Sequence, residues 1–310
     1  MSVALITHPA CLAHDPGPQH PESPARLRRV LAALDADRFR PLRREAAPLA
    51  TREQLERVHP AEYCETILAL APAAGERIML DADTVIGPGS VEAARRAAGG
   101  AVLAVDQVMG GDVATAFVAT RPCGHHAERR RAMGFCVFSN AAVAARHAQA
   151  RWGVARVAVV DFDVHHGNGT EDDLRDDPNL FYASSHQSPC YPGTGDAAET
   201  GVAHNVVNVP LPPGAGGVRF LAAWERVILP ALDAWAPDLL IVSAGFDAHR
   251  ADPLAQLEVE SADFGRLTAA LLAVARQRCG GRLVSLLEGG YDLDALAESA
   301  AVHVEALLHN

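Results

Sequence analysis

Residues 157–170 read Val-Ala-Val-Val-Asp-Phe-Asp-Val-His-His-Gly-Asn-Gly-Thr, an apolar run followed at once by a cluster of reactive side chains. The apolar run is short and rich in β-branched residues, which predicts a strand that is covered on both faces, as in a parallel sheet. Successive side chains of an extended chain point to opposite sides, so Asp161, Asp163 and His165 share one side and Phe162 and Val164 the other. The stretch therefore predicts a parallel α/β protein with two carboxylates and an imidazole at the end of one strand.

Further strand-sized apolar runs alternate with helix-sized stretches along the chain. The other runs are residues 3–6, 114–118, 180–183, 206–209, 239–242 and 283–287. The predicted helices are residues 24–34, 91–109, 139–151, 218–234, 262–276 and 293–308. This alternation predicts an α/β fold of three layers, with a mostly parallel central sheet and helices on both faces. Because no linker-like segment or internal repeat divides the chain, we expect a single domain over residues 1–310.

Reactive side chains follow four of these runs at their carboxyl ends. They lie in residues 121–126, 161–168, 244–247 and 288–291. In an open parallel sheet the carboxyl ends of the strands meet at one edge, and ligands bind there. Asp163 and His165 form half of a metal site, to which Asp247 can add a third ligand. Such a set suits zinc and leaves a coordination position open, although ferrous iron is an alternative for a set with only one imidazole.

Each of these residues also has an ordinary structural interpretation when it is taken alone. A single His at a strand end is commonly a hydrogen-bonded structural residue, a single Asp is a cap or turn residue, and Gly-Gly-Tyr is a turn with a packed aromatic ring. The combination is what packing does not explain, because all of these features recur at the same predicted edge.

Composition excludes several classes of protein. The formal net charge of −11 over 310 residues argues against a direct nucleic-acid partner, whose binding surface should be basic. No apolar run approaches the roughly 20 residues that span a bilayer, and residues 1–10 lack the pattern of a signal peptide, so no membrane association is expected. The six cysteines have no paired spacing, which argues against a disulfide framework and favours a cytoplasmic location.

The motifs together resemble the histone deacetylase family of the arginase/deacetylase-like fold, nearest its class II and bacterial amidohydrolase branches. The matching blocks are residues 20–26, 121–127, 134–136, 161–170, 191–196, 244–247 and 288–292. The resemblance implies a metal-dependent amidohydrolase that removes an acetyl or other short acyl group from an amine. The substrate implied is acetylated lysine in a peptide or protein, or a small acylated amine. An oligomer is compatible with the sequence.

The resemblance also implies roles for individual residues. Asp163, His165 and Asp247 are expected to bind one zinc ion. His126 is expected to act as general base and then general acid. The remaining catalytic residues are His125 as an electrostatic partner, Asp161 and Asn168 as orienting groups for the two histidines, and Tyr291 as the donor to the oxyanion.

The same resemblance implies a narrow substrate tunnel and a structural potassium site. Phe135 and Tyr191 should wall the tunnel, with Gly134, Asp83 and Leu254 beside it. Arg26 matches an arginine at the foot of a channel for acetate, but from the sequence it could equally be a surface charge on a helix. Potassium is expected to be bound by Asp161, Asp163, His165, Ser184 and Ser185.

Departures from the family pattern bear on the substrate. Cys123 replaces the second proline of the usual Arg-Pro-Pro-Gly-His-His, and a small apolar filler is the preferred interpretation of it. Relatives that prefer acetylated polyamines can place an acidic residue where this chain has Leu254, so acetyl-lysine is favoured over acetylpolyamines. Asp81 and Asp83 could still recruit a cation, bind the substrate backbone, or shape a turn. More remote alternatives are a binuclear manganese ureohydrolase, which would need a carboxylate at Gly167, and a metal-binding scaffold without turnover.

Overall fold

The computed structural model describes residues 2–309, and an eight-stranded sheet forms its centre. The strand order is β2-β1-β5-β10-β9-β6-β7-β8, and every neighbouring pair is parallel. The strands are β1 Val3–Thr7, β2 Arg43–Ala46, β5 Thr115–Val118, β6 Val157–Asp161, β7 Leu180–Gln187, β8 Val206–Leu211, β9 Leu239–Ala244 and β10 Leu283–Leu287. The predicted mostly parallel sheet is therefore confirmed.

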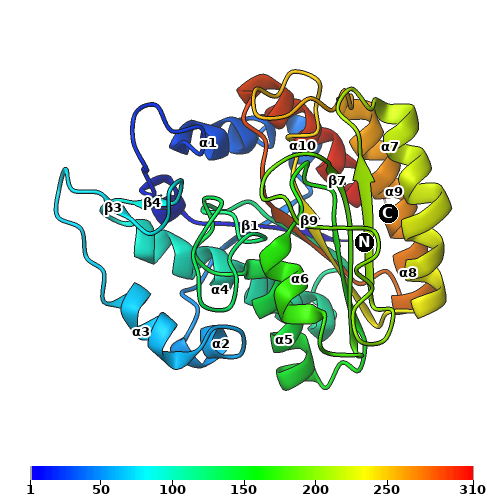
Figure 1. Cartoon of the computed structure of the whole chain (residues 1–310), viewed down its shortest axis with the longest axis horizontal. Coiled ribbons are helices and arrows are strands. Elements are labelled where there is room, and N and C mark those ends of the chain that lie inside the picture. The colour runs from blue at the N-terminus through cyan, green and yellow to red at the C-terminus, as the bar shows by residue number, and fades with distance from the viewer. Residues whose placement is uncertain (1, 310) are drawn as a thin grey trace.

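Helices cover both faces of the sheet (Figure 1). One hydrophobic cluster joins the strands to α1 Pro24–Ala33, α7 Gly217–Ala223, α8 Leu229–Trp235, α9 Ser261–Cys279 and α10 Leu293–Leu308. A second cluster joins the opposite face to α2 Arg52–Glu56, α3 Ala61–Leu68, α4 Ser90–Gly110, α5 Asn140–Trp152 and α6 Asn168–Leu174. Leu5 belongs to the first cluster while Ala4 and Ile6 belong to the second, as the alternation of side chains along a strand requires. The predicted three-layer fold is confirmed.

One predicted helix is interrupted. The sequence predicts a single helix over residues 218–234, whereas α7 and α8 are separated by a π-helical turn, Trp224–Ile228. Pro230 lies in the first turn of α8. Proline has no N–H and its ring crowds the carbonyl four residues earlier, so a widened turn ahead of it relieves both problems.

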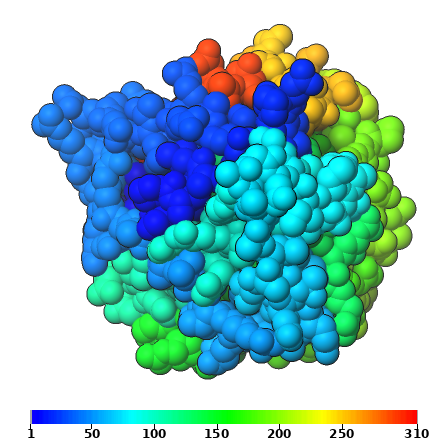
Figure 2. Space-filling model, turned by 90° about the vertical axis from the view of Figure 1, so that its left-hand side faces the viewer, coloured from blue at the N-terminus to red at the C-terminus, as the bar shows by residue number. Residues whose placement is uncertain are grey.

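Several short elements have no counterpart in the sequence prediction. They are β2, α2, α3, α6 and a small antiparallel hairpin of β3 Ile78–Met79 and β4 Val85–Ile86. In Figure 2 the cyan segment that carries this hairpin covers much of the face seen. Among residues 2–309, no helix combines the length and apolar character that crossing a membrane demands.

Candidate active site

The carboxyl ends of four adjacent strands, β5, β10, β9 and β6, bring the reactive segments together. Asp161 is the last residue of β6, and Asp247 follows the end of β9 by a short turn. Glu288 follows β10 directly, and the tandem histidines come shortly after β5. Phe162 and Val164 lie in the hydrophobic core, so the intervening Asp161, Asp163 and His165 point the other way, as the sequence predicts.

Asp163, His165 and Asp247 form a buried cluster of three ligands. Nδ1 of His165 lies 3.0 Å from Oδ1 of Asp163 and 3.2 Å from Oδ2 of Asp247. The second oxygen of each carboxylate accepts a backbone N–H, from Gly289 at 2.8 Å for Asp163 and from Val164 at 2.8 Å for Asp247. The donor atoms all lie within 4.8 Å of one another, which is compact enough to surround one metal ion.

The negative charge of the two carboxylates in this cluster favours a bound cation. Burial, followed by the neighbouring Asp163 carboxylate, raises the pKa of Asp247 to about 7. Two buried carboxylates at such short range repel each other unless a positive charge lies between them. Gly289 lets them approach, because a Cβ at this position would lie 2.1 Å from Oδ2 of Asp247.

The tandem histidines are each held by a hydrogen bond at Nδ1. His125 contacts Oδ2 of Asp161 at 3.0 Å, and His126 contacts Oδ1 of Asn168 at 2.8 Å. The amide of Asn168 is fixed in turn, because its Nδ2 donates to Glu128 at 2.9 Å. Both acceptors face Nδ1, so each imidazole carries a proton there and presents Nε2 on its other side.

The two imidazoles differ in their electrostatic surroundings. Burial lowers the pKa of His126 well below its usual range, and the adjacent His125 and His165 lower it further. Burial also opposes a charge on His125, but the carboxylates of Asp163 and Asp161 raise the pKa of that imidazole well above its usual range. These surroundings favour a neutral imidazole at His126 and a protonated one at His125.

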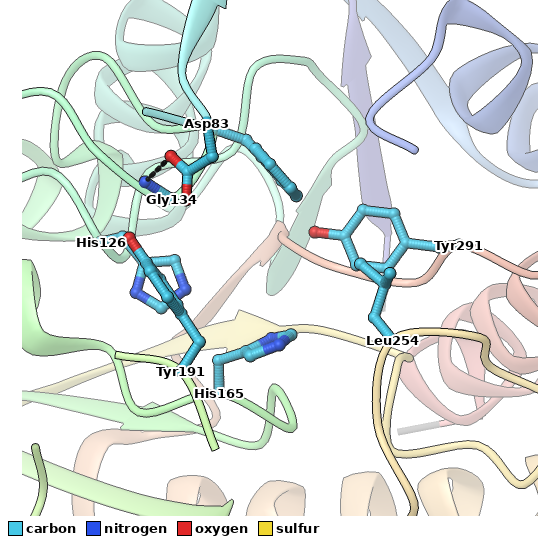
Figure 3. Close-up of a pocket in the computed structure, with 8 residues that line it drawn as sticks. Asp83, His126, Gly134, His165, Tyr191, Leu254 and Tyr291 are labelled. Carbon is cyan, nitrogen blue, oxygen red and sulfur yellow. Dashed lines mark hydrogen bonds between the residues drawn. The ribbon is translucent and has the colours of Figure 1, made fainter. Parts of the chain in front are cut away.

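A cavity of about 240 Å³ opens onto these groups (Figure 3). The Tyr291 hydroxyl points into it from the side opposite His126. Burial raises the pKa of the Tyr291 phenol well above its usual range, so the hydroxyl keeps its proton. The lining residues are Asp83, His126, Gly134, Phe135, His165, Tyr191, Leu254 and Tyr291.

The wall beside His126 is tightly packed. Gly134 has φ 56°, and a Cβ there would lie 2.3 Å from Cδ2 of His126. Phe135 also has a positive φ, 67°, which is strained for a residue with a side chain. Hydrogen bonds hold the strained segment, from Gly134 N–H to Asp83 Oδ1 and from Phe135 N–H to Thr84 Oγ1, both 3.0 Å.

The two acidic residues of the rim, Asp81 and Asp83, each make structural contacts. Asp81 forms an ion pair with Arg131, at 2.7 Å between Oδ2 and Nη2. Asp83 accepts the N–H of Gly134, as described, and thereby shapes the wall of the cavity. These contacts show that both residues shape the local structure, and Asp83 also lines the cavity, so its predicted contact with substrate stays a prediction.

Arg26 is fully buried, so its interpretation as a surface charge is wrong. Its guanidinium donates to the carbonyls of Gly290 at 2.5 Å and Glu288 at 2.6 Å, and to Glu22 at 3.0 Å. It lies 4.7 Å from the centre of the Tyr291 ring. The charge is tolerated because the Glu22 carboxylate and these carbonyls replace water around it.

The residues expected at a potassium site are only partly brought together. Ser184 pairs with Asp161 across β6 and β7, which places the two residues side by side. The hydroxyl of Ser184 contacts Nδ1 of His186 at 3.0 Å, and that of Ser185 accepts from Trp224 Nε1 at 2.9 Å. The Ser185 side chain is therefore directed toward α7 and α8, away from Asp161.

Two supporting carboxylates were given no individual role in the sequence prediction, although Glu288 lies in one of its reactive segments. Glu288 accepts the N–H groups of Gly124 at 2.7 Å and His125 at 3.2 Å, which fixes the backbone that carries the tandem histidines. Asp252 accepts the N–H groups of Tyr291 at 2.7 Å and Leu254 at 3.0 Å, which fixes the opposite wall. The position of Glu288 at a strand end indicated it as reactive without giving its role, whereas Asp252 has no comparable signal in the sequence.

Comparisons with known proteins agree with this geometry. The histone deacetylase domain model matches residues 20–307. An uncharacterized protein of Synechocystis sp. is 42% identical over 310 residues, 99% of each chain. The histone deacetylase-like amidohydrolase of Pseudomonas aeruginosa is 44% identical over 277 residues, which are 88% of this chain and 72% of that protein. The crystal structure of the HDA15 HD domain is similar with a TM-score of 0.91 at 36% identity, covering 98% of this chain and 88% of that one. The chain belongs to the histone deacetylase family.

Proposed function

We propose that the protein is a zinc-dependent hydrolase that removes an acetyl or other short acyl group from an amine, with acetyl-lysine in peptides or proteins as its preferred substrate. The observation that carries the proposal is the arrangement of three groups around one cavity. These groups are the ligand cluster of Asp163, His165 and Asp247, the neutral imidazole of His126, and the hydroxyl of Tyr291. The names of the relatives, a deacetylase-like amidohydrolase among them, agree with it.

The ligand cluster fits zinc. Ligands at about 2.0–2.1 Å from a tetrahedral zinc ion are about 3.3–3.4 Å apart. The separations from Nδ1 of His165 to the two carboxylate oxygens, 3.0 Å and 3.2 Å, are close to this ligand–ligand distance. Asp163, His165 and Asp247 would hold the ion, and three protein ligands leave a position open for water or substrate. When bound, zinc polarises the substrate carbonyl and makes water more acidic.

The side chains around the cavity can carry out the proton transfers. His126 holds its proton on Nδ1 through Asn168, so its Nε2 is free to take a proton from the attacking water. The same nitrogen then returns the proton to the departing amine, which must leave protonated. His125, charged and paired with Asp161, contributes a positive charge near the reacting atoms.

Tyr291 is placed to stabilise the oxyanion that forms at the substrate carbonyl. Its hydroxyl keeps its proton at neutral pH because burial raises its pKa. A donor aimed at developing negative charge lowers the barrier more than it strengthens substrate binding. In the proposal, the Arg26 guanidinium packs over the Tyr291 ring and fixes it, and Arg26 lies on the side of the cavity through which acetate departs.

The shape and charge of the cavity support a narrow acyl-amine chain as substrate. Phe135 and Tyr191 present ring faces and edges, which suit the methylene groups of a lysine side chain. Leu254 lines the cavity and offers no partner for a distal ammonium group. We therefore prefer acetyl-lysine over acetylated polyamines, the alternative substrate class.

The ureohydrolase alternative conflicts with the packing at Gly167. A second metal would need a carboxylate at this position, but even a Cβ there would lie 2.3 Å from Oδ2 of Asp161. A scaffold without turnover would need neither a base such as His126 nor a hydroxyl donor such as Tyr291 beside the ligand cluster. Both observations favour a mononuclear enzyme.

Two further parts of the proposal concern potassium and location. A potassium ion would be held by Asp161, by carbonyls of Asp163 and His165, and by Ser184, with Ser185 able to contribute its carbonyl only. All six cysteines are free thiols, which agrees with a reducing compartment such as the cytoplasm.

The test is turnover of an acetyl-lysine peptide and of N-acetylated polyamines measured side by side, with metal content determined on the same preparation. His126→Ala, purified in the same way, serves as the control for contaminating deacetylases. We expect turnover of the peptide, absent in the variant, and a kcat/KM for the peptide above that for the polyamines. A preference of tenfold or more for the polyamines would overturn the substrate assignment, and absence of turnover on both would overturn the activity.

A further inference from the structure

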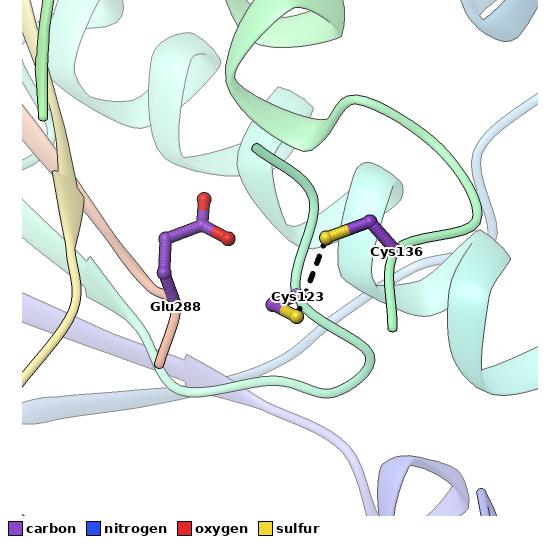
Figure 4. A group of neighbouring side chains, drawn as sticks. All are labelled: Cys123, Cys136 and Glu288. Carbon is purple, nitrogen blue, oxygen red and sulfur yellow. Dashed lines mark hydrogen bonds between the residues drawn. The ribbon is translucent and has the colours of Figure 1, made fainter. Parts of the chain in front are cut away.

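Two cysteines lie in contact (Figure 4), and Phe135 of the cavity wall packs against them. Sγ of Cys123 and Sγ of Cys136 are 3.4 Å apart, and both side chains are buried. Cys123 lies two residues before His125, and Cys136 directly follows Phe135 of the wall. The pair therefore connects the segment of the tandem histidines with the segment that forms the wall.

We propose that Cys123 and Cys136 are a site of reversible oxidation, at which a small peroxide converts the two thiols into a disulfide and thereby switches off turnover in the adjacent cavity. One thiol attacks the peroxide, the O–O bond breaks, and a sulfenic acid and one water (or alcohol) are formed. The second thiol then attacks the sulfenic sulfur and releases a second water, which leaves the S–S bond. The two thiols lose two electrons and two protons in total, and the peroxide is reduced.

The surroundings favour a disulfide over a metal as the product. Glu288 also lies near both thiols, so the three side chains resemble a metal site. Its carboxylate is already engaged, with Oε2 accepting from Gly124 and His125 and Oε1 accepting from Ser243. A metal would require both thiols to lose their protons beside this carboxylate, whereas a disulfide uses no third group.

Both thiols are buried and neither lines the cavity, so an oxidant must be small enough to pass the Phe135 ring. Phe135 packs against the two cysteines and faces the cavity on its other side. Sγ of Cys136 donates to Sγ of Cys123 at 3.4 Å and to the carbonyl of Gly134 at 3.3 Å, so we assign the first attack on peroxide to Cys123. Because the attacking species is a thiolate and the site is buried, the reaction is slow and needs a long incubation.

We expect the bond to displace catalytic groups, because both cysteines lie in segments that carry them. A disulfide requires the sulfurs to approach from 3.4 Å to about 2.0 Å. Sγ of Cys136 also lies 3.4 Å from the backbone nitrogen of His126. Gly134, two residues before Cys136, has no free space toward the His126 ring. Since a displacement of about 1 Å can cost about 10²-fold in rate, we expect at least about a tenfold loss of turnover.

The experiment oxidises the zinc-loaded protein with hydrogen peroxide for several hours and follows three quantities. Peptide mapping measures the Cys123–Cys136 link, thermal unfolding measures stability, and deacetylation measures the ratio of oxidised to reduced activity. The link should form, the melting temperature should rise because a loop is closed, and the activity ratio should fall and recover with dithiothreitol. Glutathione disulfide, which is too large to reach two buried thiols, should react much more slowly.

Variants separate this pair from the other thiols. Cys123→Ala, with Cys123→Ser as a second choice if the first does not fold, should keep its activity under peroxide. Cys64→Ala on α3 and Cys279→Ala on α9 each remove a buried cysteine outside the cavity wall, and both should be inactivated like the wild type. Cys190 contacts His165, so Cys190→Ser is compared with its own reduced activity; protection of this variant against peroxide would assign the inactivation to Cys190 and overturn the switch.

The outcomes that contradict the proposal are specific. Two results would overturn the switch: loss of activity under peroxide in both Cys123 variants, or formation of the Cys123–Cys136 link in the wild type without loss of activity. Absence of the link after oxidation would overturn the site itself. The inhibition rests on the proposed function, but mapping and melting do not, so a protein that forms the link yet deacetylates nothing would contradict only the function.

Discussion

Tyr291→Phe isolates one hydroxyl group from everything else in the site. The ring of Tyr291 contacts Phe135, at 5.9 Å between ring centres, and lies 4.7 Å from the Arg26 guanidinium. A phenylalanine ring keeps both contacts. Within the described residues the hydroxyl makes no hydrogen bond to another protein group, so its removal leaves no buried partner unsatisfied. We expect the free energy of unfolding to change by less than about 0.5 kcal/mol.

The effect on catalysis should be much larger than the effect on stability. Loss of one donor to an oxyanion costs about 10²–10³ in kcat, or about 2.7–4 kcal/mol of transition-state stabilisation. Steady-state kinetics on an acetyl-lysine peptide should show this fall in kcat with little change in KM, because the interaction forms mainly in the transition state. Thermal unfolding of the same preparation provides the control. A variant that folds normally and retains kcat within threefold of the wild type would refute the assignment of Tyr291.

Three further substitutions test other parts of the site. Leu254→Glu should raise kcat/KM for acetylated polyamines relative to acetyl-lysine peptides several-fold, on the order of 1 kcal/mol at a wet rim, and an unchanged ratio would mean that Leu254 does not reach the substrate. Asn168→Leu removes the acceptor of the His126 Nδ1 proton, so kcat should fall at least about tenfold while metal content stays the same; unaltered kcat would show that Asn168 does not orient the base. Gly134→Ala places a Cβ against the His126 ring at a positive φ, so turnover should be largely lost while Ala132→Gly, nearby on the same loop, serves as the control for folding; an active Gly134→Ala enzyme would contradict the close packing described for the wall.

The parts of the fold that could be predicted are those in which burial determines the residue types. The apolar runs of β5, β6, β9 and β10 are covered on both faces, so their sequences identify them. The side-chain alternation that places Asp161, Asp163 and His165 together follows from the same geometry. Side chains that lie close together because they follow the same strand can therefore be predicted from the sequence.

Other elements owe their structure to neighbours that the sequence does not reveal. β2 has the sequence Arg-Arg-Glu-Ala, which carries no apolar pattern, and it is a strand because its backbone pairs with β1 at the edge of the sheet. α2 did have a local signal, since Thr51 and Gln54 form a capping box.

The same limit applies to the supporting residues of the site. Arg26 lies on a short helix whose sequence is compatible with an exposed charge, and its burial depends on the carbonyls of Glu288 and Gly290, far away in the chain. Asp252 holds both Leu254 and Tyr291, a contact that arises only when the loop after β9 meets the loop after β10. Residues that act through distant backbone groups need the structure to be found.

Titration of the metal-free protein with zinc tests the central claim most directly. The claim is that one ion, held by Asp163, His165 and Asp247, is needed to hydrolyse the acetyl amide. Turnover of an acetyl-lysine peptide should be absent without metal, rise in proportion to added zinc, and level off at one equivalent per chain. Undiminished turnover in metal-free protein, or full activity only at two equivalents of manganese, would contradict the account.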